Sequence, residues 1–152
     1  MDIRFFEKPG CIGNARQKAI LLAAGHTLHI EDILLYPFTN MELESFFTGL
    51  PIENWFNLPA PRIKSGDFNT HTIGENQAVV EMLLDRLLIR RPLLEFGDTR
   101  LAGFSIEQLE SLGVKCTQGP RLELLERNNL EACPGEQIGL KCSEPRTLPN
   151  LE

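Results

Sequence analysis

The hydrophobic positions of the first thirty residues predict a strand, a helix and a second strand. Residues 3–6, Ile-Arg-Phe-Phe, form the short apolar run that is typical of a buried strand. Asn14 with Gln17 matches a capping box, which predicts a helix that ends at Gly25. Residues 27–30 alternate weakly and predict the second strand, parallel to the first in a right-handed unit. The predicted apolar face of the helix comprises Ala15, Ala19, Leu22 and Ala23.

The middle of the chain, about residues 39–85, predicts a segment of helices inserted between strands. Capping boxes at residues 39–42 and 72–75 each precede a helical pattern, and the second pattern is strongly apolar. Residues 51–56 predict one further helical turn, which carries the single tryptophan. Residues 58–66 have no clean period and predict a loop.

The last predicted elements are a hairpin and a helix. Gly97-Asp98 lies between apolar segments at residues 90–96 and 100–104, which is a hairpin signal. Ser105 with Gln108 predicts a final helix. Parallel strands first, an antiparallel hairpin later and helices between them predict an α/β domain with a mixed four-stranded sheet.

The character of the chain changes after the last predicted helix, so we expect a domain at residues 1–113 and an extension at 114–152. Residues 120–129 could hold one short helix. Residues 130–152 are broken by prolines and glycines and contain few large apolar side chains. The extension is therefore predicted to be irregular, and either loosely packed or disordered.

Charge and composition narrow the classes of function. The formal net charge is -6 and the sequence pI is about 5.1, which argues against binding to DNA, RNA or anionic membranes. No signal peptide and no apolar run of about 20 residues is present in the sequence, so a cytoplasmic protein is expected. In that reducing compartment the four cysteines are more often free, catalytic or metal-bound than paired in disulfides.

Cys11 is the candidate for chemistry. It follows Pro9-Gly10 at the turn between the predicted strand and helix, where the positive end of the helix dipole favours a thiolate, and Lys8 could add a second positive charge. The alternative is a buried structural cysteine. No cysteine stands three residues away on either side, so a resolving thiol must come from glutathione, another protein or the extension.

The other candidate residues are weighed against ordinary roles. Arg91, Arg62 and Arg100 could bind an oxyanion beside a thiolate, or they could be solvated surface charges. Cys116, Cys133 and Cys142 are not spaced like zinc ligands, and all three histidines lie upstream of them, so free thiols are expected and no metal site is predicted. A tail cysteine that resolves an adduct on Cys11 is a further alternative.

Several segments together resemble the thioredoxin-like arsenate reductase (ArsC) family, which also includes the Spx transcription regulators. The resemblance covers residues 3 to about 112 and is strongest to the branch called nitrogenase-associated protein. The motifs that carry it are Phe6-Glu-Lys-Pro-Gly-Cys-x-x-Asn-Ala-Arg-Gln-Lys18, Trp55-Phe-Asn57, Ala60-Pro-Arg-x-Lys-Ser-Gly66 and Leu88-Ile-Arg-Arg-Pro-Leu-Leu-Glu95.

The resemblance implies a thioredoxin-like fold and a site. Cys11 would be the nucleophile that attacks arsenate, Arg91 would bind the oxyanion, and Pro92 would be the family's cis-proline. No bound cofactor is implied, and glutathione with glutaredoxin would supply the electrons. Asn57 and Gly103 stand where the arsenate enzymes carry further arginines.

Two hypotheses follow from different classes of function. The first is a thiol-dependent reductase that acts through Cys11. The second is a non-catalytic accessory or regulatory module that binds a protein partner in nitrogen fixation or transcription. The expected partners are accordingly glutaredoxin or a nitrogenase-related protein.

Overall fold

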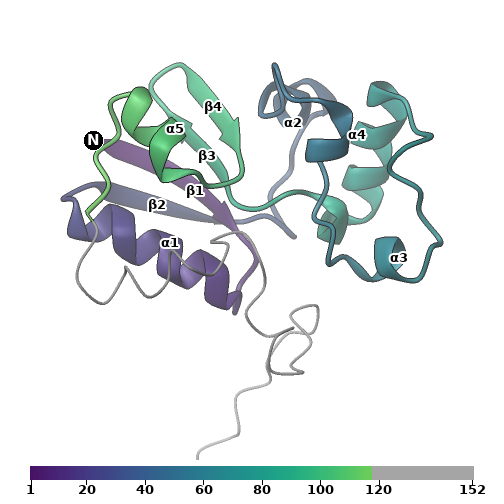
Figure 1. Cartoon of the computed structure of the whole chain (residues 1–152), viewed down its shortest axis with the longest axis horizontal. Coiled ribbons are helices and arrows are strands. Elements are labelled where there is room, and N and C mark those ends of the chain that lie inside the picture. Colours follow the sequence, from purple (N-terminus) through teal and green to yellow (C-terminus); the bar gives the residue numbers. More distant parts are fainter. Residues whose placement is uncertain (118–152) are drawn as a thin grey trace, which may run out of the picture.

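The computed structural model describes residues 1–117 and contains one mixed four-stranded sheet (Figure 1). The strands are β1 (Asp2–Glu7), β2 (Thr27–Asp32), β3 (Leu93–Phe96) and β4 (Thr99–Ala102), in the order β2-β1-β3-β4. β1 is parallel to β2 and antiparallel to β3, which is antiparallel to β4. The predicted parallel opening, the hairpin and the mixed sheet are therefore confirmed.

The helix α1 (Ile12–Ala23) forms where it was predicted, but its start and its buried face differ from the prediction. Cys11 is the N-cap, so the helix begins before Asn14 and the predicted capping box is wrong. The predicted apolar face is also wrong, because Ala15, Ala19, Leu22 and Ala23 are exposed. The buried residues of α1 are Gly13, Asn14, Gln17, Ile20 and Leu21. Apolar residues occur on both sides of the second half of this helix, so hydrophobicity alone could not fix its rotation.

The insertion contains five short helical elements (Figure 1). The predicted cap at Thr39 is confirmed, since its side chain accepts a hydrogen bond from the Glu42 amide (3.1 Å). Gly74 rather than Thr72 caps the apolar helix, and a one-turn helix with Pro61 in its first turn occupies part of the predicted loop. The elements are α2 (Asn40–Ser45), η1 (Ile52–Asn54), α3 (Pro61–Lys64), α4 (Glu75–Leu84) and η2 (Arg86–Leu88).

The last element, α5 (Ile106–Ser111), is capped as predicted, because the Ser105 side chain accepts a hydrogen bond from the Gln108 amide. Val114 lies just after the expected domain boundary at residue 113. Val114 is fully buried, and its amide donates to the Leu109 carbonyl (2.9 Å). The helix predicted within residues 120–129 and the predicted irregular tail lie outside the described residues.

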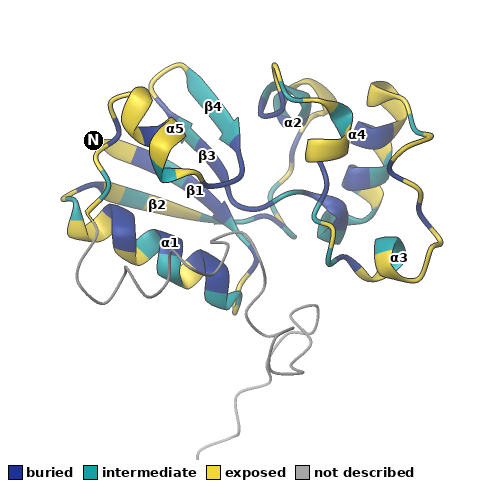
Figure 2. Cartoon of the chain, viewed as in Figure 1, coloured by how far each residue is buried: buried dark blue, intermediate teal, exposed yellow. Residues whose placement is uncertain are grey.

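The buried hydrophobic residues of the domain form two clusters. Figure 2 shows where the buried positions lie along the chain. Successive side chains of a strand point to opposite faces. Ile3 and Phe5 of β1 accordingly pack with α1 and α5, whereas Phe6 belongs to the cluster of the insertion. That second cluster also contains Leu93 and Ala102, at the ends of β3 and β4 nearest the insertion. The insertion therefore packs against the end of the sheet at which β1 finishes and the Cys11 loop begins.

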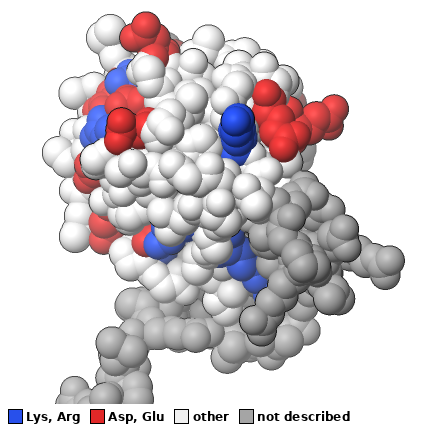
Figure 3. Space-filling model, turned by 90° about the vertical axis from the view of Figure 1, so that its left-hand side faces the viewer, with Lys and Arg blue, Asp and Glu red and all other residues white. Residues whose placement is uncertain are grey.

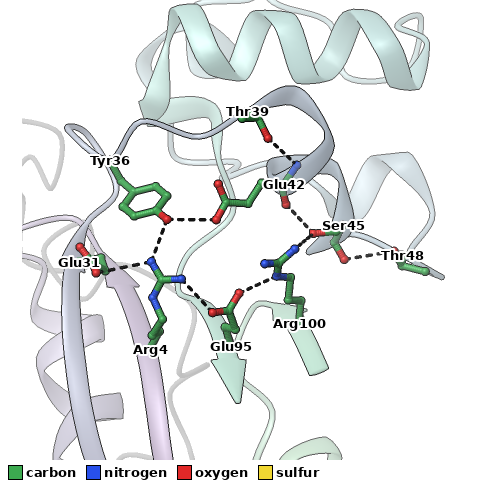
Figure 4. A network of polar contacts seen from close by, with 9 residues as sticks. All are labelled: Arg4, Glu31, Tyr36, Thr39, Glu42, Ser45, Thr48, Glu95 and Arg100. Carbon is green, nitrogen blue, oxygen red and sulfur yellow. Dashed lines mark hydrogen bonds and ion pairs between the residues drawn. The ribbon is translucent and has the colours of Figure 1, made fainter. Parts of the chain in front are cut away.

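A polar network also joins the sheet to the insertion (Figure 4). Arg4, Glu95 and Arg100 lie side by side on β1, β3 and β4. Glu95 accepts hydrogen bonds from Arg4 (2.9 Å) and Arg100 (2.6 Å), and Arg100 also donates to the Ser45 hydroxyl of α2 (2.9 Å). Burial alone would raise the pKa of Glu95, but the hydrogen bonds from Arg100 and Arg4 outweigh it and hold that pKa below its ordinary value.

Substitution of Glu95 by Gln should remove an acid-sensitive part of the stability. Because the folded-state pKa is depressed, the ionised carboxylate stabilises the fold above the ordinary value of 4.5, and that contribution is lost as pH falls through the folded-state pKa. We expect the Gln variant to lose about 1–2 kcal/mol at pH 7. In urea unfolding between pH 3 and 7, the free energy of unfolding of Glu95→Gln should fall less steeply towards acid pH than that of wild type. The exposed Glu107→Gln is the control, and an equally steep fall in wild type and Glu95→Gln would contradict the prediction.

Charged side chains on the face drawn in Figure 3 are scattered, with basic groups separate from one another and mixed with acidic ones. No helix within residues 1–117 is long and apolar enough to cross a membrane. The same residues contain no group of three His, Cys, Asp or Glu side chains placed to hold a metal ion.

Candidate functional site

The loop between β1 and α1 is a tight turn that places Cys11 at the start of the helix. The Cys11 amide donates to the Lys8 carbonyl (3.1 Å), which closes a four-residue turn with Pro9 and Gly10 at its centre. Gly10 has a φ of 79°, the left-handed value that the third position of a type II turn requires. Proline presets the second position of such a turn, so Pro-Gly fixes the loop locally.

Cys11 is the N-cap of α1, with extended backbone dihedrals and a half-buried side chain. Its carbonyl accepts the hydrogen bond of the Ala15 amide (3.1 Å), while its side chain caps no backbone group. The first amides of a helix have no partner within the helix, and the positive end of the helix dipole lies there. A thiolate, or an anion held beside it, is stabilised at this position.

Asn14 anchors the turn to the helix from within. Its Oδ1 accepts from the Lys8 amide (3.3 Å), and its Nδ2 donates to Gln17 Oε1 (2.8 Å). Both side chains are almost completely buried. The sequence pattern predicts a helix cap from this pair and does not reveal that Asn14 holds the loop that carries Cys11. The signal was two polar residues spaced to share the buried face of the helix.

Arg91 lies two residues before β3, and its peptide bond to Pro92 is cis, the geometry that the resemblance implies. The side chain is buried, and within residues 1–117 its Nη1 atom has no hydrogen-bond partner. Burial lowers the pKa of Arg91, and the charge of the Cys11 thiolate raises it in the opposite direction. Burying a cationic nitrogen without a partner is costly, so this atom is a vacant donor for an anion.

Lys8 is the second buried cation at this site, with only 3% of its surface exposed. Burial lowers the pKa of Lys8 most, the charge of Arg91 lowers it further, and the Cys11 thiolate raises it. Lys8, Arg91 and Cys11 therefore lie close enough for the charge of each to affect the others.

Arg62 and Arg100 are engaged by carboxylates. Arg62 donates twice to Glu81 Oε2 (3.1 Å each) within the insertion. Arg100 is bound to Glu95 in the network of Figure 4. The anion-binding role expected for Arg62 and Arg100 therefore finds no support in their contacts.

The two positions without the expected arginines have structural roles. Asn57 donates from its side chain to the Leu87 carbonyl (3.1 Å). Gly103 has a φ of 91°, and its amide donates to the Pro92 carbonyl (2.8 Å). A side chain at Gly103 would be strained in that backbone conformation, so an arginine could not replace it without a change in the chain path.

Cys116, the second cysteine within residues 1–117, is expected to be much less reactive than Cys11. Burial, with a smaller effect of Glu110, raises the pKa of Cys116 to about 11. At neutral pH it remains a thiol and is a poor nucleophile.

We therefore expect iodoacetamide at pH 7.5 to modify Cys11 at least about tenfold faster than Cys116, because only the thiolate reacts. Quenched digests analysed by mass spectrometry measure the two rates separately. The Cys116 rate should rise steeply between pH 9 and 11, and comparable rates at pH 7.5 would contradict the assignment of Cys11 as the reactive thiol.

Comparisons with known proteins agree with this geometry. No family model matches the sequence. The uncharacterized 15.7 kDa protein in the draG 3' region of Rhodospirillum rubrum is 37% identical over 143 residues, which cover 94% of this chain and 95% of that protein.

Solved structures give the same fold at lower identity. A Bacteroides fragilis protein named as related to the ArsC family has a TM-score of 0.64 and 24% identity, over 74% of this chain and 99% of its own. Arsenate reductase from Vibrio cholerae has a TM-score of 0.61 and 14% identity, over 76% of this chain and 98% of its own. The predicted thioredoxin-like, ArsC-type fold is thus confirmed. The chain belongs to the family of the uncharacterized Rhodospirillum rubrum protein and has the fold of the ArsC arsenate reductases.

Proposed function

We propose that this protein is an ArsC-like thiol-redox protein that acts through a Cys11 thiolate. The observation that carries the proposal is the buried Arg91, whose Nη1 atom lacks a partner within residues 1–117 and whose charge interacts with Cys11 at the helix N-terminus. A thiolate beside a vacant cationic donor suits the attack of sulfur on a bound oxyanion.

The proposed substrate class is an oxyanion such as arsenate. Cys11 would displace one arsenate oxygen and form a sulfur–arsenic bond, and Arg91 and Lys8 would balance the charge of the anion. Glutathione, with glutaredoxin, would then supply two electrons. In sum, arsenate and two thiols give arsenite, one disulfide and one water.

The test is a coupled assay with the full-length protein, arsenate, glutathione and glutaredoxin. NADPH oxidation through glutathione reductase reports turnover, and the proposal expects a rate that depends on arsenate and saturates with it. If the protein adds nothing to the background rate at any arsenate concentration, arsenate reduction is refuted. If Cys11 also forms no mixed disulfide with oxidised glutathione, the redox role as a whole fails.

A second candidate is a non-catalytic accessory module in nitrogen fixation. Asn57 and Gly103 replace two expected arginines, and Arg62 and Arg100 are bound to carboxylates, which favours this candidate. The resemblance to the nitrogenase-associated branch suggests a nitrogenase-related partner. Affinity purification of the tagged protein from nitrogen-fixing cells tests it. The absence of a stable partner, together with unchanged nitrogenase activity on deletion, would count against it.

A further inference from the structure

Lys8 is a lysine that the fold buries beside the reactive thiol. Only 3% of its surface is exposed, although lysine is one of the residues least often buried in proteins. The Cys11 amide donates to the Lys8 carbonyl (3.1 Å) across the Pro9-Gly10 turn, so the Cα atoms of Lys8 and Cys11 lie within about 7 Å of each other. Asn14 holds the same backbone, because its Oδ1 accepts from the Lys8 amide (3.3 Å). The point from which the Lys8 side chain starts is therefore fixed next to Cys11.

The reaction proposed for this site needs a proton at a definite place. When the Cys11 thiolate displaces an oxygen of an oxyanion, that oxygen leaves as hydroxide unless a neighbouring acid protonates it. Arg91 can bind the anion through its Nη1 atom, but it cannot supply the proton, because a guanidinium does not deprotonate in proteins. A second group that can give up a proton is therefore required beside Cys11.

The two histidines that follow α1 lie at the opposite ends of α1 and β1 from Cys11. His26 comes after the C-terminal end of α1, where its Nε2 lies 2.7 Å from the Lys115 carbonyl oxygen. The 12 residues of α1, which span about 18 Å, separate it from Cys11. His29 Nε2 lies 3.4 Å from Asp2 Oδ1, at the start of β1, whereas Cys11 follows the end of that strand. Neither histidine is placed to protonate an anion at Cys11.

Two further titratable groups have other surroundings. Glu7 directly precedes Lys8, but its Oε2 lies 2.6 Å from Lys18 Nζ of α1 in an ion pair. His71 is exposed and belongs to the insertion. Lys8 is the buried side chain that carries protons to donate and lies close enough to Cys11 for their charges to interact.

We propose that Lys8 is the proton donor of the reaction at Cys11 and that its ammonium protonates the oxygen that leaves the oxyanion. This inference rests on the proposed function. In the first step the Cys11 sulfur bonds to arsenic, an arsenic–oxygen bond breaks, and the leaving hydroxyl takes a proton from Lys8 and departs as water. In the second step the sulfur of glutathione attacks the Cys11 sulfur, and the sulfur–arsenic bond breaks with its electron pair on arsenic.

The second step also restores the proton donor. The neutral Lys8 amine takes the proton of the glutathione thiol and becomes an ammonium again. Arsenic is reduced by two electrons, and the sulfurs of Cys11 and glutathione are oxidised to a mixed disulfide. Protons and electrons therefore balance over the two steps, with Lys8 unchanged at the end.

The electrostatics of the cluster support this role. Burial lowers the pKa of Lys8 most, the charge of Arg91 lowers it further, and the Cys11 thiolate raises it. A general acid is most effective when its pKa lies near the working pH, and burial is one way in which proteins lower the pKa of a lysine. When the thiolate is consumed in the bond to arsenic, its charge no longer raises the pKa of Lys8. The ammonium therefore becomes a stronger acid at the step in which the leaving oxygen needs a proton.

Lys8→Arg separates proton donation from charge, because arginine stays cationic and does not release its proton. In the coupled assay with arsenate we expect kcat to fall at least about a hundredfold, while the KM for arsenate stays within about threefold of wild type. The mixed disulfide that Cys11 forms with oxidised glutathione requires no protonation of a leaving oxygen, so its rate of formation should change much less than kcat. Lys115→Arg is the matched control, since Lys115 is exposed.

Two results of this assay would overturn the proposal. Wild-type turnover in Lys8→Arg would show that Lys8 supplies only its charge. Equal losses of arsenate turnover and of mixed-disulfide formation would show that Lys8 has a structural role. If wild type itself reduces no arsenate, the proposed function fails, and the role of Lys8 as its proton donor fails with it.

A second measurement depends neither on turnover nor on the folding of Lys8→Arg. The affinity for sulfate is measured between pH 6.5 and 9.5 in Cys11→Ser, where the thiol no longer titrates. It should fall at least about tenfold as pH rises, because the Lys8 ammonium loses its proton and a charged hydrogen-bond donor is lost. Cys11→Ser with Lys8→Met should bind sulfate weakly and with little dependence on pH. A constant affinity in Cys11→Ser would overturn the proposal, because Lys8 would then not exchange its proton in the working range.

Discussion

Substitution of Arg91 by Met is expected to weaken anion binding at Cys11 strongly while leaving the fold intact or more stable. A hydrogen bond between charged groups contributes about 1.5–3 kcal/mol, so sulfate or arsenate should bind at least about tenfold more weakly. The same substitution removes a buried cationic nitrogen that has no partner within residues 1–117. The free energy of unfolding without anion should therefore stay constant or rise by up to about 2 kcal/mol.

The measurement is urea unfolding with and without sulfate or arsenate. Wild type should gain stability as the anion concentration rises, and Arg91→Met should gain much less. Arg90→Met is the control for loss of a neighbouring charge, because Arg90 donates to the Asn54 carbonyl (3.0 Å). A large loss of stability in Arg91→Met, with anion stabilisation retained, would show that Arg91 is structural.

Substitution of Cys11 by Ser is expected to reduce thiol-dependent turnover to background, a loss of at least about a thousandfold. Serine keeps the turn and the N-cap position, since Cys11 makes its two backbone hydrogen bonds through main-chain atoms. A hydroxyl cannot form the mixed disulfide, so this variant tests the thiol chemistry separately from anion binding. Stabilisation by sulfate should persist in this variant.

The readouts are NADPH consumption in the coupled assay and the mass of the glutathione adduct. Cys116→Ser is the matched control and should retain both, because burial raises the pKa of that thiol to about 11 and keeps it unreactive at neutral pH. Turnover that survives in Cys11→Ser would assign the chemistry to another residue.

The arrangement has a further physical consequence, because the features that make the site are costly to the free protein. Lys8 and Arg91 are both buried cations near one another, and burial lowers the pKa of each. The hydrogen bond of Asn14 to the Lys8 amide and the packing of two large apolar clusters stabilise the fold and offset the free-energy cost of burying these two cations. An Arg91 variant that is more stable than wild type but inactive would show that this site trades stability for function.

Local sequence signals were sufficient where one turn or one cap decides the structure. Pro9-Gly10 predicted the turn at Cys11, Thr39 and Ser105 predicted their helix starts, and Gly97-Asp98 predicted the hairpin. In each of these cases the interacting groups lie within a few residues of one another, so the pattern contains the whole interaction.

Local sequence patterns gave a wrong prediction where one pair of polar residues is compatible with two different structural roles. Asn14 and Gln17 fit a capping box, but they are buried in the first turns of α1, where Asn14 bonds the Lys8 amide. The prediction of the apolar face failed with it, because α1 is apolar on two sides. Only packing of Ile20 and Leu21 on the sheet chose which side is buried.

Patterns in the sequence were enough to predict the element order, the mixed sheet and the position of Cys11 at a helix start. These depend on periodicity, caps and turns, which act over short separations. Which arginine is left to interact with the thiol depends on tertiary contacts. Arg91 is buried, and its Nη1 atom has no partner in the described part of the chain, whereas Arg62 and Arg100 are bound to Glu81 and Glu95. The partner of a long, flexible cation is set by contacts between residues far apart in sequence, so the spacing of arginines along the chain could not reveal it.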